Sequence, residues 1–331
     1  MFVKYADGAE KPSIKAMSKD NLPLALYEKH REELGLDNPA LFENENQLFE
    51  ERAAPIRSAV VFLPKSKPLI AMTLSLVSGL VAEGGTIVLA GANDAGIRSA
   101  RDAYEAAIGP VERKIIGNHS ALYVGKNKRL GAGKTWRDFL SFFPLAYSGV
   151  SIEAASLPGV FSAGSLDEGT RLLLDAVPYS AESMASGKAA VRALDMGCGA
   201  GIVGAVYKKR SPGTEVVFCD ISLAAVHAAQ ETLARNGLAG TVVRSDVFDG
   251  VTGTFDLILC NPPFHIGIET DYSFIEKFAR GARAHLAPGG EVWVVANAFL
   301  PYMEILERHI GPTEVAADGK KFRIYRSRAA A

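Results

Sequence analysis

The chain has 331 residues, 48% of them hydrophobic and 22% charged, which favours two globular domains with sizeable cores. Its net charge of −1 excludes a generally basic nucleic-acid-binding protein, so any contact with RNA must come from local clusters of charge. No apolar run reaches 18 residues, and residues 1–20 do not resemble a secretory signal, so we expect no contact with a membrane.

The first half of the chain predicts a small α/β domain. Apolar runs at 59–64 and 86–89 predict strands, and the segments 111–116 and 121–124 predict a hairpin. Basic residues lie around these segments, and we interpret them as ordinary solvated surface, with a local basic face for phosphates as the alternative. They are Lys65, Lys67, Arg98, Arg101, Lys126, Lys128 and Arg129.

The second half alternates strands with helices. Ser165-Leu166-Asp167-Glu168 has the pattern of a capping box, in which Ser165 caps a helix. Strands are predicted at 191–196, 215–220, 241–245, 255–260 and 290–296, and helices at 202–210, 222–236, 272–286 and 301–309. The segments 313–317 and 321–326 predict a terminal hairpin. This order indicates a parallel sheet with helices on both faces and an antiparallel hairpin at its end.

Several short segments of the first half recur in the second, which indicates an internal duplication of one fold. Residues 59–64 mirror 257–262, Gly84-Gly85 mirrors Gly289-Gly290, and Ile108-Gly109-Pro110 mirrors Ile310-Gly311-Pro312. The first copy has no glycine-rich loop before its strand at 59–64, so we expect it to have lost cofactor binding and catalysis. Chance similarity between two α/β domains is the alternative.

A glycine-rich turn follows the first strand of the second half. In Asp195-Met196-Gly197-Cys198-Gly199-Ala200-Gly201, backbone N–H groups can approach a ligand closely. The turn also matches the dinucleotide fingerprint, and Asp220, 21 residues after Gly199, suits ribose hydroxyls, so NAD and S-adenosylmethionine both fit. Two features favour S-adenosylmethionine. Asp195 is placed to hold the amino-acid group of the cofactor, and the pair Ser245-Asp246 is placed to bind the amino group of its adenine.

Asn261-Pro262-Pro263-Phe264 closes the apolar run 255–260 and indicates chemistry on a planar amine. The lone pair of such an amine is delocalised into the ring, and acceptors that bind its hydrogens can turn the lone pair toward a methyl group. The Asn261 side-chain oxygen and the Pro262 carbonyl suit this role, and Phe264 suits stacking on a flipped base. The two signals together predict methyl transfer from S-adenosylmethionine to a ring-attached nitrogen.

The three cysteines, Cys198, Cys219 and Cys260, all lie at the ends of predicted strands. Their odd number and spacing indicate a reducing cytoplasm rather than disulfides. We interpret them as small buried thiols and expect no metal site.

These motifs resemble those of the bacterial ribosomal RNA small subunit methyltransferase C family. The segments that carry the resemblance are 157–162, 166–170, 194–201, 261–265 and 295–302, with weaker likeness at 63–68 and 96–100. The resemblance implies two tandem Rossmann-like methyltransferase domains, 1–155 and 156–331, the second built on a seven-stranded sheet that ends in an antiparallel hairpin. It implies that the second domain methylates N2 of a guanine in 16S ribosomal RNA, while the first supports folding or RNA recognition.

By motif match, the resemblance carries over Asn261 and Phe264 as catalytic residues, and Asp195, Gly197, Gly199, Asp220 and Asp246 as cofactor residues. From the motifs themselves we add Pro262 to the catalytic residues, and Gly201, Ser245 and Asn261 to the cofactor residues. We expect a partner in ribosomal RNA or the small ribosomal subunit, and we favour a monomer. Alternatives are methylation of 23S ribosomal RNA, transfer RNA or a protein glutamine, and an NAD-dependent oxidoreductase, which leaves residues 261–264 without a role.

Overall fold

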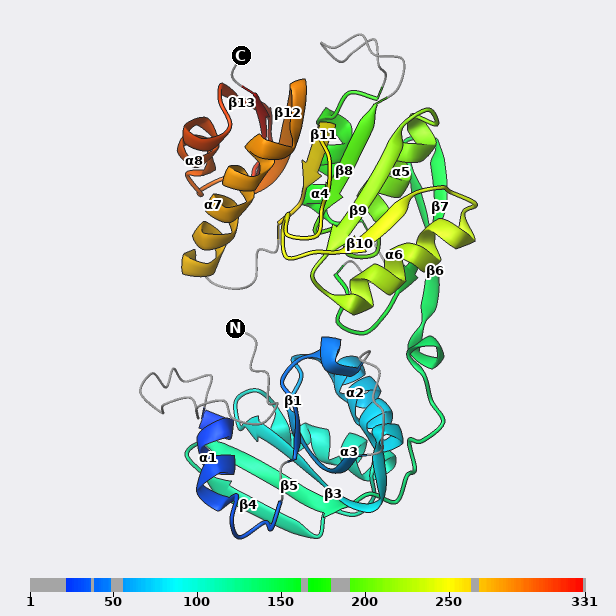
Figure 1. Ribbon diagram of the computed structural model, residues 1–331, viewed down its shortest axis with the longest axis vertical. Helices are drawn as coiled ribbons and strands as arrows, with labels where there is room; N and C mark the ends of the chain where they lie inside the picture. The colour runs from blue at the N-terminus through cyan, green and yellow to red at the C-terminus, as the bar shows by residue number, and fades with distance from the viewer. Residues whose placement is uncertain are drawn as a thin grey trace. The chain divides into compact units, whose positions relative to one another are not determined.

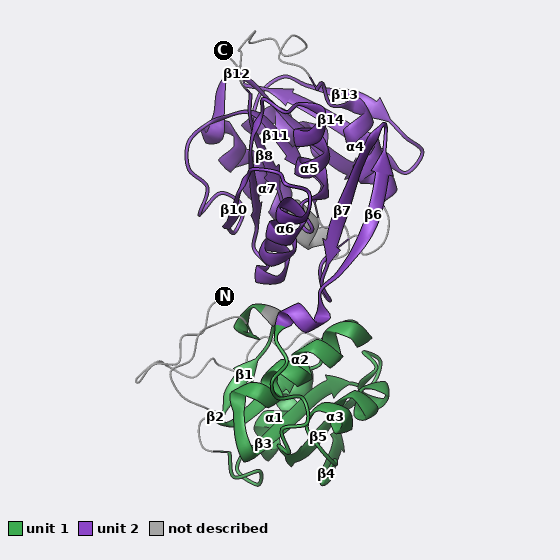
Figure 2. Ribbon diagram, turned by 90° about the vertical axis from the view of Figure 1, so that its right-hand side faces the viewer, with its two compact units in different colours: residues 1–135 green, residues 136–331 purple. Residues whose placement is uncertain are grey.

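The computed structural model describes residues 22–36, 39–48, 56–161, 166–179, 191–262 and 268–329, without the side chains of 45 and 268–273. The chain forms two compact units, residues 1–135 and 136–331 (Figure 2). Residues 136–155, which the sequence assigns to the first domain, thus belong to the second unit. They do so because their hairpin, β6 (Ser141–Tyr147) and β7 (Val150–Ser156), shares the core of that unit.

The first unit is built on a five-stranded sheet in the order β1-β2-β3-β5-β4. Its strands are β1 (Ala40–Phe42), β2 (Ile56–Phe62), β3 (Val81–Ala92), β4 (Arg113–Gly117) and β5 (Ser120–Lys126). Its helices are α1 (Leu22–His30), α2 (Lys67–Leu80) and α3 (Arg101–Ala107), with short 3-10 turns at Glu45–Leu48 and Ile97–Ala100. Helices α2 and α3 share one core cluster with alternate residues of β2 and β3, and α1 shares another with the residues between them.

The second unit is built on a seven-stranded sheet in the order β10-β9-β8-β11-β12-β14-β13 (Figure 1). Its strands are β8 (Arg192–Met196), β9 (Glu215–Asp220), β10 (Thr241–Arg244), β11 (Phe255–Cys260), β12 (Leu286–Asn297), β13 (Thr313–Asp318) and β14 (Phe322–Arg328). Its helices are α4 (Glu168–Ala176), α5 (Ile202–Arg210), α6 (Leu223–Arg235), α7 (Ile268–His285) and α8 (Tyr302–His309), with a 3-10 turn at Trp136–Phe139. The predicted sheet with its antiparallel terminal hairpin is confirmed.

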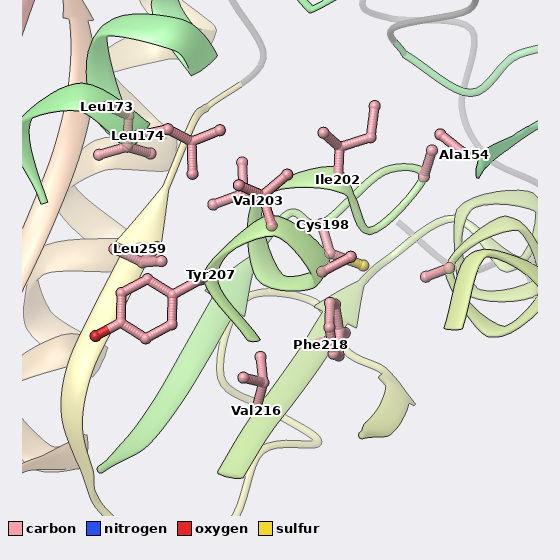
Figure 3. Packing of buried hydrophobic residues seen from close by; sticks show 14 of the residues in the cluster. Ala154, Leu173, Leu174, Cys198, Ile202, Val203, Tyr207, Val216, Phe218 and Leu259 are labelled. Atoms are coloured by element: carbon pink, nitrogen blue, oxygen red, sulfur yellow. The ribbon is translucent and has the colours of Figure 1, made fainter. Parts of the chain in front are cut away.

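Helices cover both faces of the second sheet because alternate strand residues point to opposite sides. Leu257 and Leu259 of β11 join a core cluster with α4, α5, α6 and the β6–β7 hairpin. Ile258 and Cys260 join a second cluster with α7 and α8. Figure 3 shows part of the first cluster, with Tyr207 of α5 near Leu259 and other buried side chains. Within the described residues, no helix combines the length and apolarity needed to cross a membrane.

The duplication is confirmed in the pairing of the strands. In the first unit, β1, β2 and β3 pair in parallel, and β5 and β4 follow as antiparallel strands. The second unit repeats this pattern: β8, β11 and β12 pair in parallel, and β14 and β13 follow as antiparallel strands. The recurring Ile-Gly-Pro segments also agree, since Gly109 and Gly311 both have left-handed backbones, with φ of 134° and 145°. Among the described residues of the first unit, however, no strands correspond to β9 and β10. The first copy is therefore the smaller one.

Three local expectations differ from the structure, and the first is that α7 begins at Ile268 rather than at residue 272. Helix α4 begins at Glu168 with Asp167 as its N-cap, because the Asp167 side chain accepts from the Thr170 N–H; the predicted cap, Ser165, lies outside the described residues. Strand β12 begins at Leu286 rather than near residue 290, because Leu286 already pairs with Phe255 before the irregularity in the ladder.

Candidate functional site

The candidate site lies at the carboxyl edge of the second sheet, between β8 and β11. Strands β9 and β10 lie to one side of β8, whereas β11 and β12 lie to the other, so the order of the strands reverses at this point. Such a switch point leaves a crevice in which α/β proteins bind their ligands. Met196 at the end of β8 pairs with Cys260 at the end of β11. The residues that follow them, Gly197 and Asn261, therefore lie side by side. The two sequence signals thus converge in space.

The loop after β8 requires glycine because of its backbone conformation. Gly197, Gly199 and Gly201 have φ of 67°, 54° and 74°, in the left-handed region that strains other residues. Among the described residues, a Cβ at Gly197 would meet nothing within 4 Å, and one at Gly199 would meet only the Phe161 carbonyl oxygen at 3.9 Å. The described part of the chain thus leaves open space beside the loop, which suits a ligand that approaches the backbone.

The glycines at the start of α5 serve a different purpose, which is close packing of the helix on the sheet. A Cβ at Gly204 would lie 2.3 Å from Cε1 of Phe218, and one at Gly201 would lie 3.1 Å from Cβ of Ala229. The structure thus separates the fingerprint into an open part, Gly197 and Gly199, and a packed part, Gly201 and Gly204.

Asp195, the fourth residue of β8, is buried with 2% exposure. Its Oδ2 accepts a hydrogen bond of 2.8 Å from the Gly204 N–H in the first turn of α5. Burial raises the pKa of Asp195 to about 7, the bond from Gly204 opposes this rise, and the nearby Asp220 carboxylate adds to it. The carboxyl group therefore holds the start of α5 beside the glycine loop.

Asp220 ends β9, on the opposite side of β8 from Asn261. Its Oδ2 accepts a 3.0 Å bond from the Gly199 N–H, and its Oδ1 accepts a 2.9 Å bond from the Ser222 N–H. The side chain thus joins the glycine loop to the start of α6, where Ser222 is the N-cap. The carboxylate therefore lies at the carboxyl edge of the sheet, beside the open part of the glycine loop.

Ser245 and Asp246, which follow β10, have different surroundings. The buried Ser245 hydroxyl donates to the Val247 carbonyl oxygen at 2.7 Å and accepts from the Gly250 N–H at 2.9 Å, so it holds the turn together. Asp246 reaches the surface, where it forms an ion pair of 2.8 Å with Lys277 of α7. Of this pair, Asp246 is thus the side chain that presents an exposed acceptor.

Asn261 and Pro262 are the described residues of the predicted amine-binding motif, while Pro263 and Phe264 lie outside the described residues. The Asn261 Nδ2 group donates a hydrogen bond of 2.8 Å to the Thr170 hydroxyl. Its Oδ1 is buried and accepts no hydrogen bond from any described group. A buried acceptor without a donor costs about 1–3 kcal/mol, and a ligand N–H that reaches it would remove this cost.

Two contacts of the site were not predicted from the sequence. Thr170 belongs to a segment that the sequence marks as a helix start and as part of the family resemblance, without a site role for Thr170, and Lys277 belongs to a helix without a motif. Their partners are Asn261 and Asp246, which are distant in the chain, so no local pattern identifies them.

The basic residues of the first unit do not form one local face, because they lie at two edges of the sheet, which favours the interpretation as ordinary surface. One group follows the carboxyl ends of β2 and β3: Lys65, Lys67, Arg98 and Arg101. The other group lies at and after the end of β5: Lys126, Lys128 and Arg129. Strand β5 is antiparallel to β3, with Lys126 opposite Thr86 and Ser120 opposite Ala92, so its end lies at the amino edge of β3.

The three cysteines are buried, and burial raises the pKa of each thiol. They are therefore protonated at neutral pH, unlike thiolates that bind metals. Within the described ranges, no three or more His, Cys, Asp or Glu side chains gather in an arrangement that would hold a metal ion.

The arrangement fits S-adenosylmethionine. Among the described residues the backbone is open at Gly197 and Gly199, the Asp220 carboxylate lies beside Gly199 at the end of β9, and Asp246 presents an exposed acceptor. The unpaired Asn261 oxygen lies one strand away from the glycine loop.

Each unit matches a known protein family. The family Methyltransferase small domain matches residues 151–326, and Methyltransferase small domain N-terminal matches residues 15–143.

Curated relatives named Ribosomal RNA small subunit methyltransferase C are similar over most of their length. The protein from Pseudomonas aeruginosa (strain UCBPP-PA14) is 39% identical over 273 residues, which are 82% of this chain and 79% of that protein. A protein from Vibrio cholerae (El Tor Inaba N16961) is 36% identical over 281 residues, which are 84% of this chain and 80% of that protein.

A solved structure is similar over both units. It is described as the T. thermophilus 16S rRNA N2 G1207 methyltransferase in complex with AdoMet and guanosine. The TM-score is 0.72 at 25% sequence identity, with 86% of this chain and 76% of that chain covered.

Proposed function

The chain belongs to the ribosomal RNA small subunit methyltransferase C family, and from this premise we propose how its site acts on a guanine of small-subunit ribosomal RNA. The protein is a methyltransferase that uses S-adenosyl-L-methionine and methylates the exocyclic N2 amine of the guanine. The NAD-dependent alternative has no support, because the relatives are methyltransferases and the similar solved structure contains AdoMet.

One observation carries the proposed site, which is the state of the Asn261 side chain. Its amide nitrogen is anchored on Thr170, while its amide oxygen is buried and unpaired among the described groups, one strand from the glycine loop. An N2 amine brings two hydrogens, and a fixed carbonyl oxygen accepts one of them. We assign the second to the Pro262 carbonyl oxygen, the next acceptor along the loop.

These two hydrogen bonds favour the reaction because they change the geometry of the amine nitrogen. The N2 lone pair of guanine is delocalised into the ring, so it is a weak nucleophile. Hydrogen bonds from both N2 hydrogens to fixed acceptors draw the nitrogen toward a tetrahedral shape and turn its lone pair toward the methyl group. The acceptors bind more strongly as the hydrogens become more acidic, so they stabilise the transition state more than the bound substrate. Phe264 is proposed to stack on the base.

S-adenosyl-L-methionine supplies an electrophilic methyl group when it is bound. We propose that the backbone at Gly197 and Gly199 lies against the cofactor, that Asp220 accepts from the ribose hydroxyls, and that Asp246 accepts from the adenine amine. Asp195, Gly201 and Ser245 shape this site: the first two hold the start of α5, and Ser245 holds the turn before Asp246. The methionine group then lies toward the β8–β11 crevice.

The first unit is proposed to support folding or RNA recognition rather than catalysis. Among its described residues there is no glycine-rich loop beside β2, and strands equivalent to β9 and β10 are absent. The equivalent of the Asn-Pro-Pro-Phe motif reads Leu63-Pro64-Lys65-Ser66. We propose a monomer that acts on the small subunit or its RNA, which implies a place in the cytoplasm.

The test is nucleoside analysis of ribosomal RNA from a strain that lacks this protein. Mass mapping is expected to show one N2-methylguanosine missing from 16S RNA, restored by the wild-type gene. A complete set of N2-methylguanosines in 16S RNA, with a loss in 23S or transfer RNA instead, would contradict the proposed substrate.

A further inference from the structure

We infer that Thr170, held by Asp167, is a positioning residue that fixes which end of the Asn261 carboxamide faces the substrate amine. This inference rests on the proposed function of Asn261. It concerns a different element, because Thr170 lies in the first turn of α4, ahead of the glycine loop, and meets Asn261 across 91 positions of sequence.

Three side chains form a continuous hydrogen-bonded chain. The Asn261 Nδ2 group donates to Thr170 Oγ1 at 2.8 Å, and the Thr170 hydroxyl donates to Asp167 Oδ2 in a short bond. Asp167 Oδ1 also accepts a 3.0 Å bond from the Thr170 N–H, as the N-cap of α4. Thr170 is only 5% exposed, so water has little access to its hydroxyl. The two bonds from Asp167 fix both the backbone and the side chain of Thr170.

The directions of these bonds follow from counting protons. A carboxylate only accepts, so the single hydroxyl proton of Thr170 must point to Asp167. Thr170 Oγ1 can then offer only a lone pair to Asn261. The nitrogen end of the carboxamide must therefore face Thr170, since the flipped amide would place two oxygens together without a proton between them.

The consequence is that the oxygen end of Asn261 is the end left without a described donor, and this oxygen is buried. This orientation of the Asn261 carboxamide matters for methyl transfer to the amine. The amine of guanine presents hydrogens, so it requires an acceptor; the opposite orientation of Asn261 would confront it with a second amino group. Asp167 and Thr170 thus prepare the acceptor before substrate arrives, which avoids a reorganisation cost at the moment of reaction.

The first turn of α4 is also packed closely on the sheet, so this arrangement is rigid. A Cβ at Gly169 would lie 2.9 Å from Cγ1 of Val295 in β12, hence only glycine brings the turn this near. The three residues therefore act together. Asp167 caps the helix, Gly169 allows its close approach to the sheet, and Thr170 supplies the hydroxyl group that binds Asn261.

The experiment compares Thr170→Val, which keeps the shape but removes the hydroxyl, with Thr170→Ser, which retains it. Single-turnover methylation of small ribosomal subunits is measured with saturating cofactor, and cofactor affinity is measured by calorimetry. We expect Thr170→Val to lower the rate by roughly 10- to 100-fold, the equivalent of one buried polar contact. Thr170→Ser should stay within about threefold of wild type, and cofactor affinity should be unchanged in both.

Two controls separate positioning from general damage. Thr73→Val is a matched change of a buried threonine in the first unit, where the hydroxyl has no described partner, and it should leave the rate unchanged. In an Asn261→Ala background, Thr170→Val should cause little further loss, because the side chain that it positions is already absent. If Thr170→Val does not fold, Thr170→Ala carries the same comparison.

A wild-type rate in Thr170→Val, an equal loss in Thr170→Ser, or a full further loss in the Asn261→Ala background would overturn the inference. These outcomes are distinct from failure of the proposed function. If the wild-type protein forms no N2-methylguanosine on small-subunit RNA, the function itself is refuted; if it does so and Thr170→Val is unaffected, only the role of Thr170 is refuted.

Discussion

The buried carboxyl group of Asp195 should make the stability of the second unit depend on pH, and Asp195→Asn should remove that dependence. The folded pKa of about 7 lies above the ordinary value of 3.8, chiefly because of burial. Between these values the folded protein retains a proton that the unfolded chain has released. The contribution of Asp195 to stability is therefore fully present below about pH 4 and is lost as the pH rises to about 7.

The size of the effect follows from the shift in pKa. One pKa unit corresponds to about 1.4 kcal/mol, and about two units of the shift lie between pH 5 and 7, so the loss over this range is about 3 kcal/mol. Asparagine has the same shape, and its oxygen can still accept the bond from the Gly204 N–H, but it does not titrate. The free energy of unfolding of Asp195→Asn relative to wild type should thus rise by about 3 kcal/mol from pH 5 to pH 8.

Urea unfolding followed by tryptophan fluorescence measures this difference in the relevant unit. Both tryptophans, Trp136 and Trp293, belong to residues 136–331, so their emission reports the second unit and not the first. Wild type and variant are compared at pH 5 and pH 8 in the same buffers, which cancels the titration of other groups. A difference between the two proteins that stays constant, or that falls with rising pH, would refute the assignment of a raised pKa to Asp195.

Two further predictions concern the cofactor and the packing of its loop. Asp220→Ala should weaken S-adenosylmethionine binding by roughly 10- to 150-fold, since it removes the proposed acceptor for ribose hydroxyls and the anchor of the Gly199 N–H; calorimetry that gives an unchanged affinity would speak against this role. Gly204→Ala should lower the free energy of unfolding of the second unit by about 1–3 kcal/mol, because the new Cβ would lie 2.3 Å from the Phe218 ring. The added change Phe218→Leu should recover part of the loss, and urea unfolding of Gly204→Ala at wild-type stability would contradict the packing argument.

Much of the second unit could be predicted because its strands and loops have strong local patterns. The run 255–260, apolar except for Asp256, is buried along its whole length, and it forms β11 with the predicted bounds. The glycine loop and the acid at the end of β9 also follow from short motifs. These features depend on neighbours in the chain, so one sequence suffices to find them.

The remaining features depend on contacts between distant residues. The bond between Asn261 and Thr170 joins α4 to the end of β11, and no spacing in the sequence indicates it. The basic residues of the first unit are close in the chain, yet the antiparallel course of β5 places Lys126 at the opposite edge from Lys65. Ser245 was predicted for its position next to Asp246, but its hydroxyl is engaged within its own turn, which only the folded loop reveals.

The central claim is that the Asn261 carboxamide grips the N2 amine of a guanine in small-subunit RNA, and Asn261→Ala tests it most directly. Single-turnover methylation of small ribosomal subunits should fall on the order of 100-fold or more, comparable to the loss of one preorganised polar contact. Cofactor affinity, measured in parallel, should remain within about twofold of wild type, because Asn261 acts mainly on the amine in the transition state. A wild-type rate of N2-methylguanosine formation by Asn261→Ala, at unchanged cofactor affinity, would show that the loop has only a structural role.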